Sequence, residues 1–154
     1  MSTTAAISPA NANIRAASHG DAAAVFALVN QLSDRYDVDR AAFDIAFAEA
    51  VDGGDRSVLL IADVDGHVAG YALMTVARLI YTRQDAAQIQ ELIVDAAWGR
   101  RGIGSSLVAA VEDICRGRGI SELIVASRRA PAFYDRLDYR STADYLKKVF
   151  NTEH

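Results

Sequence analysis

Residues 88–107, QIQELIVDAAWGRRGIGSSL, decide the fold of this chain because they predict a strand, a glycine loop and a helix in immediate succession. Residues 89–94 have the apolar, β-branched composition of a strand, and residues 95–98 form a short turn. The loop 99–104, GRRGIG, opens directly into an amphipathic helix. The first turn of a helix carries N–H groups without intrahelical partners, and the helix dipole favours negative charge there. The stretch therefore predicts a backbone cradle for a phosphate or a similar anion.

A glycine loop before a helix does not by itself indicate a binding site. Helices also begin after glycine turns that bind nothing, so a bare GxG is a weak signal. The pair Arg100 and Arg101 and the hydroxyls of Ser105 and Ser106 favour an anion site. No GKS or GKT sequence follows the loop, and the GxGxxG spacing is absent. These absences exclude a P-loop and a dinucleotide-binding fingerprint.

The composition indicates one globular domain. The chain has 154 residues, of which 51% are hydrophobic and 23% charged, and it has no apolar run long enough to span a membrane. The first residues, MSTTAAISPANAN, lack the pattern of a signal peptide, so we expect a cytoplasmic protein with a flexible tail at 1–12 and one domain at 13–154. The lone Cys115 is expected in the core, and three scattered histidines predict no metal site.

Charge is distributed unevenly along the chain. From residue 100 onward there are 10 basic and 7 acidic residues, net +3, against 6 and 13 before it, net −7. A basic loop in an acidic protein favours a small polyanionic ligand over nucleic acid. Residues 34–55 hold seven carboxylates against two arginines. These form either a solvated helix face or a negative lip that attracts a cationic amine.

Hydrophobic periods predict the other elements. The first elements are a strand at 14–17, a helix capped by Ser18 and Asp21, whose apolar face carries Val25, Leu28, Val29 and Leu32, and a second helix with Phe43, Phe47 and Val51 on one face. Strands at 58–62 and 68–79 follow, joined by an Asp65-Gly66 turn, and then the strand 89–94 and the helix after the loop. The last elements are a buried strand at 123–126, a helix at 130–137 and closing strands within 139–150.

Two motifs carry a resemblance to the GCN5-related N-acetyltransferase (GNAT) superfamily. Its acetyl-CoA loop reads Gln/Arg-x-x-Gly-x-Gly/Ala after a strand that often ends Leu-x-Val-Asp. Residues 92–95, LIVD, match the strand end, and Gly102 and Gly104 match the small positions, whereas Gly99 replaces the usual Gln or Arg. Residues 132–139, AFYDRLDY, resemble the family's A-x-FY-x-x-LGF/Y ending, with an aspartate in place of its glycine.

The resemblance implies a mixed α/β fold, the GNAT or acyl-CoA N-acyltransferase fold, which is a twisted mixed sheet flanked by helices on both faces. In that fold the fourth and fifth strands splay apart and the pantetheine arm of the cofactor enters the gap. The unusual Asp138 would then have to adopt the backbone angle that glycine normally takes, which aspartate tolerates better than most residues.

The resemblance also implies a reaction, the direct transfer of an acetyl group from acetyl-CoA to a primary amine. Backbone groups of Leu92, Ile93 and Val94 would grip pantetheine, and the Val94 N–H would polarise the thioester carbonyl. Tyr134 would be the general acid for the departing thiolate. The pyrophosphate cradle would consist of Gly99, Arg100, Arg101, Gly102, Ile103, Gly104 and Ser105.

The residues themselves suggest Glu91 as the general base. It alternates with Ile89 and Ile93, so we expect it on the apolar side of the sheet, where burial would raise its pKa. Alternatively, Glu91 makes a structural hydrogen bond or is a charge at a strand edge. Weaker candidates for the base are Glu122, Asp34 and Asp37. The acidic segment 34–55 favours a small cationic acceptor over a protein.

Two other functions are compatible with the sequence. The chain could be a non-catalytic acyl-CoA-binding module that acts as a sensor, because Gly99 and Asp138 depart from the family pattern. A nucleotide-binding α/β domain is a more remote alternative. The family is often dimeric, but nothing in this sequence decides whether the chain forms a homodimer.

Overall fold

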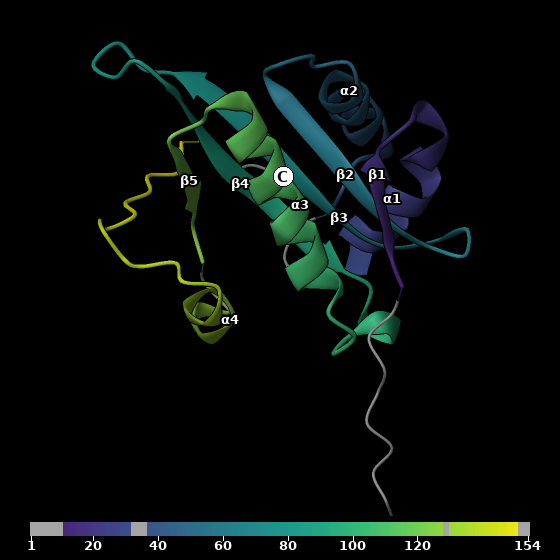
Figure 1. The fold of residues 1–154 in the computed structure, drawn as a ribbon. Helices are drawn as coiled ribbons and strands as arrows, with labels where there is room; N and C mark the ends of the chain where they lie inside the picture. Colours follow the sequence, from purple (N-terminus) through teal and green to yellow (C-terminus); the bar gives the residue numbers. More distant parts are fainter. Residues whose placement is uncertain (1–10, 32–36, 128–129, 151–154) are drawn as a thin grey trace, which may run out of the picture.

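A central five-stranded sheet carries helices on both of its faces (Figure 1). The computed structural model describes residues 11–31, 37–127 and 130–150. The strands are β1 (Asn13–Ala16), β2 (Ser57–Val64), β3 (His67–Arg78), β4 (Asp85–Val94) and β5 (Glu122–Val125). The helices are α1 (Ala22–Gln31), α2 (Arg40–Val51), α3 (Ile103–Arg118) and α4 (Pro131–Arg136), with short 3₁₀ turns η1 (His19–Asp21) and η2 (Ala96–Trp98).

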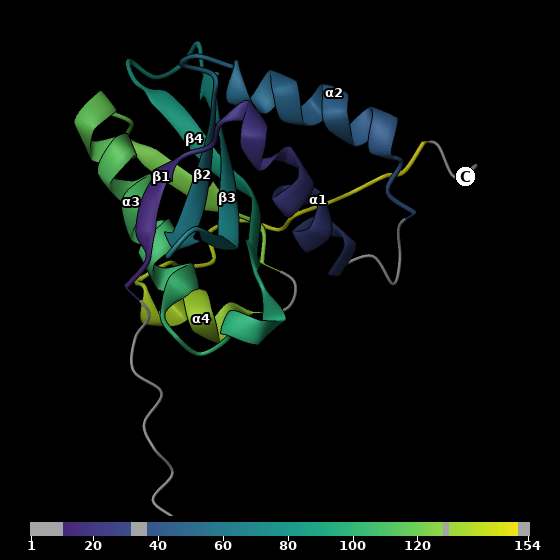
Figure 2. The same cartoon turned by 90° about the vertical axis from the view of Figure 1, so that its right-hand side faces the viewer.

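The strand order in the sheet follows the order in the chain. Strands β1 to β4 pair antiparallel with their neighbours, whereas β5 runs parallel to β4 after the α3 crossover. Helix α3 covers one face, and α1 and α2 cover the other (Figures 1 and 2). The predicted mixed α/β fold is therefore confirmed.

Each face of the sheet has its own hydrophobic core. Met74 of β3 and Leu107 and Val111 of α3 are fully buried between the sheet and α3. Cys115 of α3 packs in the same core as predicted, with its Sγ 3.6 Å from Met74 Sδ. Under α1 and α2 the core is made by the buried residues Val25, Leu28, Phe47, Leu59, Ile61, Tyr71 and Ile93. The sheet is thus packed on both sides, as a mixed α/β sheet must be.

Several local predictions are confirmed. Asp65 and Gly66 have φ values of 51° and 85°, the left-handed geometry of a type I′ hairpin turn. The Asp21 carboxylate accepts a hydrogen bond from the Ser18 N–H at 2.8 Å, as in a capping box. Asp138 takes the positive φ, 67°, that the family's glycine would take. Leu32 and residues 1–10 of the predicted tail lie outside the described residues.

Two predictions about the end of the chain are wrong. The closing strands predicted within 139–150 do not form, because residues 139–150 adopt neither helix nor strand. The strand predicted as buried at 123–126 is β5, whose side chains are only half-buried or exposed. Because the predicted closing strands are missing, no strand among the described residues lies on the outer side of β5. Strand β5 is therefore the edge of the sheet, and its side chains are less covered than the sequence predicted.

An ion-pair network joins the first strand to the first turn. The Arg15 guanidinium contacts the Asp21 carboxylate through two hydrogen bonds of 2.8 and 2.9 Å, and it contacts Asp63 at 3.1 Å. Asp21 is nearly buried, with a side chain 10% exposed. The hydrogen bonds from Arg15 lower the pKa of Asp21 from 3.8 to about 2. A carboxyl group whose pKa is depressed in the folded state stabilises the fold above its unfolded pKa.

Arg15→Ala is expected to lower the free energy of unfolding by about 2 kcal/mol at pH 7, since the Asp21 carboxylate loses its partner. The difference from the parent protein should shrink as the pH falls from about 4 towards 2, because Asp21 becomes protonated in both folded proteins. Urea denaturation at a series of pH values measures this. Arg116→Ala is the control, since Arg116 pairs with Asp113 at an exposed position and should cost under about 0.5 kcal/mol.

Among the residues that the structure describes, no helix is long and apolar enough to cross a membrane. The same residues contain no group of three or more His, Cys, Asp or Glu side chains placed to hold a metal ion.

Candidate active site

The sheet opens where β4 and β5 part. Their parallel pairing ends at Ile89 and Val125. The next residue, Gln90, has no partner in β3, because Ile89 pairs with Met74 and Glu91 pairs with Leu73. Gln90 is therefore a β-bulge. Beyond the bulge, residues 91–94 pair with β3 on one side and with no described strand on the other. This parting agrees with the splayed fourth and fifth strands that the resemblance implied.

The N–H and C=O groups of alternate residues of β4 point into this opening. The Asp95 N–H donates to the Ala69 carbonyl oxygen at 2.8 Å, so this pair is hydrogen-bonded across the β3–β4 ladder. Bonded and non-bonded pairs alternate along an antiparallel ladder, so the N–H and C=O of Ile93 also point to β3. The N–H and C=O groups of Leu92 and Val94 then point the other way, towards the β5 side. The backbone groups of Leu92 and Val94 therefore face the opening, whereas those of the third predicted residue, Ile93, pair with β3. The side chain of Ile93 is buried.

Glu91 lies next to the opening, on the face of the sheet that α1 and α2 cover. Its Oε1 accepts a hydrogen bond of 2.9 Å from the hydroxyl of Tyr71, a residue of β3. Tyr71 is 2% exposed, and burial together with the adjacent carboxylate raises the pKa of its phenol. The phenol therefore remains a hydrogen-bond donor at neutral pH.

The predicted environment of Glu91 is partly wrong. Ile93 lies on the same face as Glu91, but Ile89 packs in the other core, under α3. The bulge at Gln90 causes this, because one extra residue reverses the alternation of side chains. Glu91 is also exposed, whereas the sequence predicted a buried side chain.

The glycine loop has the backbone geometry of a tight turn into a helix. Arg100 and Gly102 have φ values of 65° and 77°, and α3 begins at Ile103. Both the N–H and the hydroxyl of Ser106 donate to the Gly102 carbonyl oxygen, at 3.0 and 2.9 Å. The N–H groups of the preceding helical residues have no carbonyl one turn earlier to bind. Exposed Gly102 and Ser105 leave this end of the helix accessible.

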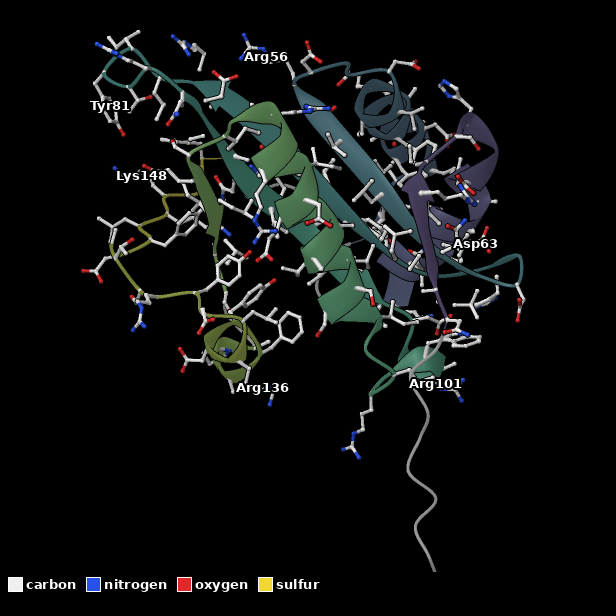
Figure 3. The ribbon with its side chains drawn as sticks, viewed as in Figure 1. Arg56, Asp63, Tyr81, Arg101, Arg136 and Lys148 are labelled. Atoms are coloured by element: carbon white, nitrogen blue, oxygen red, sulfur yellow. The ribbon has the colours of Figure 1, made fainter. Side chains whose placement is uncertain are left out.

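A stack of side chains holds one of the loop arginines. The Arg101 guanidinium carbon lies 4.8 Å from the centre of the Trp98 ring, and His67 stacks on the same indole with ring centres 5.4 Å apart. His67 also contacts the Asp95 carboxylate at 3.3 Å. Arg100 is exposed and is not part of this stack. Figure 3 shows Arg101 at the end of the molecule that also carries Arg136 on α4.

Asp95 organises the turn before the loop, a role that the sequence did not reveal. It accepts hydrogen bonds from the Ala97 N–H at 3.0 Å and from the Gln31 amide at 3.2 Å, and the Gln31 amide oxygen accepts from the Ala96 N–H. These hydrogen bonds, of which the one from the Ala97 N–H has the largest effect, hold the pKa of Asp95 below its usual value. Gln31 is 64 residues away in the chain, so only the packing of α1 reveals the contact.

Gly104 brings α4 close to the loop. A Cβ at this position would lie 3.4 Å from the Phe133 ring, which is van der Waals contact, so Phe133 of α4 packs directly against the first turn of α3. Tyr134 follows in α4 and is half-buried, with burial raising the pKa of its phenol. Its ring meets Phe133 and Tyr139 edge to face, with ring centres 4.9 and 5.6 Å apart. Tyr139 in turn donates to the Glu112 carboxylate at 2.7 Å.

A cleft of about 950 Å³ lies beyond Tyr134. It is bounded by the second half of α3, by β5, by α4 and by residues 139–145. Tyr134 lines it, whereas Glu91 and the glycine loop do not. The structure therefore brings the loop and α4 together through Gly104 and Phe133, and it leaves Glu91 on the opposite face of the sheet from α3.

Two of the three weaker candidates for the base lie among the described residues. Glu122, on β5, and Asp37, before α2, are exposed. Asp34 lies outside the described residues.

A family model described as "Acetyltransferase (GNAT) family" matches residues 25–139. Among curated proteins, the chain is 33% identical over 101 residues to glucosamine 6-phosphate N-acetyltransferase 1 of Oryza sativa subsp. japonica, covering 64% of this chain and 61% of that protein. It is 36% identical over 94 residues to mycothiol acetyltransferase of Clavibacter michiganensis subsp. michiganensis, covering 58% and 29%. The chain thus spans less than two thirds of the length of either relative.

Solved structures share the fold. The glucosamine-6-phosphate N-acetyltransferase of Arabidopsis thaliana superposes with a TM-score of 0.80 at 21% identity, covering 92% of this chain and 99% of that one. An acetyltransferase of Trypanosoma brucei gives 0.77 at 18% identity, covering 91% and 100%. The family model covers both the opening in the sheet and the glycine loop, and on this basis the chain belongs to the acetyltransferase (GNAT) family.

Proposed function

We propose that this protein transfers an acetyl group from acetyl-CoA directly to a primary amine, through one catalytic domain at residues 13–154. The observation that carries the proposal is the parting of β4 from β5 directly before the loop that begins α3. It places free backbone amides next to a basic helix N-terminus, which suits a long ligand with amide groups at one end and phosphates at the other.

The donor would lie along β4 and the loop. Backbone groups of Leu92 and Val94 would pair with the pantetheine amides, and the Val94 N–H would stabilise charge on the thioester oxygen. The open space at Gly102 suits a phosphate at the helix N-terminus, since a Cβ there would meet no atom within 4 Å. Arg100 and Arg101 would supply the positive charge.

The reaction requires two proton movements. At pH 7 an amine is mostly protonated and must lose a proton before its nitrogen can attack the thioester carbonyl. Glu91 would accept that proton, directly or through water. The carbon–nitrogen bond then forms, the carbon–sulfur bond breaks, and the departing thiolate would take a proton from the Tyr134 hydroxyl. The nitrogen would pass its second proton to the Tyr134 phenolate, which leaves a neutral amide, and Glu91 would release the first proton to solvent.

For the acceptor we favour a small cationic amine. Exposed carboxylates precede and lie along α2, on the same face of the sheet as Glu91, and they would attract positive charge: Asp37, Asp39, Asp44 and Glu49. One relative is named for N-acetyl transfer to the amino sugar glucosamine 6-phosphate, which is consistent with a small acceptor.

The deciding experiment follows thiol release from acetyl-CoA over a panel of amines that includes amino sugars, polyamines, lysine peptides and peptide N-termini. Turnover with a small amine supports the proposal. If CoA binds in calorimetry but every amine leaves the thioester intact, the chain is an acyl-CoA-binding module and not an enzyme. Tighter binding of ATP or NAD than of CoA would contradict both functions.

Replacing Arg100 and Arg101 with Ala is expected to weaken CoA binding by about 100-fold, because charge-assisted hydrogen bonds to phosphate are lost. Trp98 is the only tryptophan in the chain and lies under Arg101, so its fluorescence can follow the titration. If the variant loses more affinity for CoA than for dephospho-CoA, the two arginines bind the 3′-phosphate. If it loses equal affinity for both ligands, they bind the pyrophosphate. Replacing Arg78 and Arg83, at the distant β3–β4 turn, removes the same charge and should leave affinity within about threefold.

Tyr134→Phe is expected to lower kcat by about tenfold, with little change in KM. The effect is moderate because a thiol has a pKa of about 8.5, so its thiolate can leave without first taking up a proton. Steady-state kinetics measure it, with Tyr81→Phe as the control, since Tyr81 is 80% exposed at the β3–β4 turn. An unchanged kcat for Tyr134→Phe would remove Tyr134 from the reaction.

A further inference from the structure

A row of polar side chains lies on the sheet face that α1 and α2 share. Tyr71 belongs to the core under these helices, and alternate residues of a strand point to the same face, so Thr75 of β3 lies on this face too. Gln88 of β4 is the cross-strand partner of Thr75 and shares its face. The Gln90 carboxamide donates to the Thr75 hydroxyl oxygen at 2.9 Å, and the Glu91 carboxylate accepts from the Tyr71 hydroxyl. We name Thr75, Gln88, Gln90 and Glu91 the polar row.

The polar row is accessible to a ligand. Helices α1 and α2 pack mainly on β2 and β3 (Figure 2), whereas the row lies on β3 and β4 towards β5. Gln90 and Glu91 are exposed, and Thr75 and Gln88 are half-buried. Ile124 of β5, the neighbour of Gln88 in the sheet, is 44% exposed and forms an apolar border. The row ends at Glu91, directly before the proposed pantetheine positions, so a molecule bound along it would hold its amine beside the opening.

The two carboxamides of the row have free hydrogen-bonding groups. Gln90 uses one amide hydrogen on Thr75, which fixes its orientation, and its second amide hydrogen and its Oε1 have no partner among the described residues. The Gln88 carboxamide makes no hydrogen bond within the described parts of the chain, and it is not sealed from solvent. A carboxamide offers both a donor and an acceptor, and a hydroxyl group needs both. The row therefore places groups that suit hydroxyls next to a carboxylate that suits an ammonium group.

The charges on this face disfavour an acidic ligand. Arg78 is the only arginine or lysine in β3, β4 and β5, which the structure describes throughout, and it points to the α3 side, as Val76 does. Arg40 is the only basic residue of α1 and α2, and it pairs with Asp44 at 2.9 Å. A phosphate on the acceptor would therefore find no free cation here and would be repelled by Glu91 and by the exposed carboxylates of α2.

We infer that the acceptor is an amino alcohol or an amino sugar without a phosphate or other acidic group, whose hydroxyl groups bind Gln88 and Gln90 while its amine faces Glu91. The inference rests on the proposed acetyl transfer and names the chemical class of its acceptor. Gln88 and Gln90 determine specificity under this assignment, because they bind hydroxyl groups and take no part in proton transfer. Thr75 is a positioning residue that orients Gln90.

Three acceptors test the inference, with thiol release from acetyl-CoA as the measurement of kcat/KM. Glucosamine has an amine and hydroxyl groups, glucosamine 6-phosphate adds a phosphate, and cyclohexylamine has a ring and an amine without hydroxyls. The parent protein should use glucosamine at least about tenfold better than glucosamine 6-phosphate. Gln90→Leu and Gln88→Leu should each lower kcat/KM for glucosamine by about tenfold and for cyclohexylamine by less than about twofold, because only glucosamine loses a hydrogen bond. Comparing each variant with the parent on the same amine removes the effect of amine basicity.

Gln84→Leu is the matched control, since Gln84 is exposed on the β3–β4 turn and its variant should keep both values within about twofold. Circular dichroism and Tm check that the variants of the row fold. Equal use of glucosamine and glucosamine 6-phosphate, or equal losses for glucosamine and cyclohexylamine in both row variants, would overturn the inference and leave acetyl transfer standing. Turnover of lysine peptides or polyamines alone would do the same. If no amine consumes acetyl-CoA, the proposed acetyl transfer fails, and the inference fails with it.

Discussion

Glu91→Gln is expected to lower kcat by two to three orders of magnitude at pH 7 and to leave affinity for acetyl-CoA within about threefold. The amide keeps the shape of the side chain but cannot accept a proton. An ammonium group has a pKa of about 10.4, so only a small fraction of the acceptor is free amine at pH 7. The loss of the base Glu91 should therefore lower the rate more than the loss of the acid Tyr134. The rate should recover partly as the pH approaches the pKa of the amine.

Tyr71 gives this prediction a second, sharper part. Its hydroxyl donates to Glu91 Oε1 at 2.9 Å and thereby orients the carboxylate. Tyr71→Phe should therefore lower kcat by about tenfold, because Glu91 loses the hydrogen bond that positions it. Combined with Glu91→Gln, it should have almost no additional effect, because Tyr71 acts through Glu91.

The measurements are pH profiles of kcat for the two single variants and the double variant. Glu122→Gln is the control, since Glu122 is an exposed carboxylate on β5, away from Tyr71. If Glu91→Gln retains more than a third of the parental kcat, or if Glu122→Gln loses more activity than Glu91→Gln, Glu91 is not the base.

Gly70→Ala is expected to lower the free energy of unfolding by about 3 kcal/mol and the Tm by about 10 °C. A Cβ on Gly70 would lie 2.8 Å from the Ile93 carbonyl oxygen and within 3.4 Å of Ile103 and Leu107 side chains. The nearest atom belongs to the backbone of the paired strand, so it cannot move without disturbing the β3–β4 ladder. Ile93 adjoins the proposed pantetheine positions, so CoA binding should also weaken.

The same substitution at Gly117 is the control, and its effect should have the opposite sign. Gly117 lies in α3, where a Cβ would meet no atom within 4 Å. Alanine has the better helix propensity, so Gly117→Ala should stabilise the protein by about 0.5 kcal/mol or more. Thermal and urea unfolding measure both variants. Equal effects at the two positions would show that contact with Ile93 does not govern the cost at Gly70.

The elements that depend on short stretches of chain were predictable from the sequence. The Asp65-Gly66 turn and the positive φ of Gly102 follow from backbone sterics, and the apolar stripe of α3 follows from the helical period. The sequence therefore located the glycine loop and the helix that follows it. It did not show that Trp98 and His67 stack beside Arg101, because His67 comes from another strand.

The face on which Glu91 lies could not be predicted in full. Strict alternation placed Ile89, Glu91 and Ile93 together, but one inserted residue at Gln90 moves Ile89 to the other core. A bulge depends on how two strands register over their whole length, and the sequence of one strand does not contain that information. The Tyr71 partner of Glu91, 20 residues away, was hidden for the same reason.

The motifs of the sequence carried the resemblance to the family. The sequence also determined the loop and the order of the elements from β1 to α4, since these depend on backbone sterics and on hydrophobic period. Only the tertiary structure decided where β4 leaves β5, which backbone groups face the opening, and the unpaired state of residues 145–150. The physical reason is that a strand exists only through its neighbour. Pairing free energy belongs to two segments together, and residues 145–150 carry the pattern of a strand without a described partner for it.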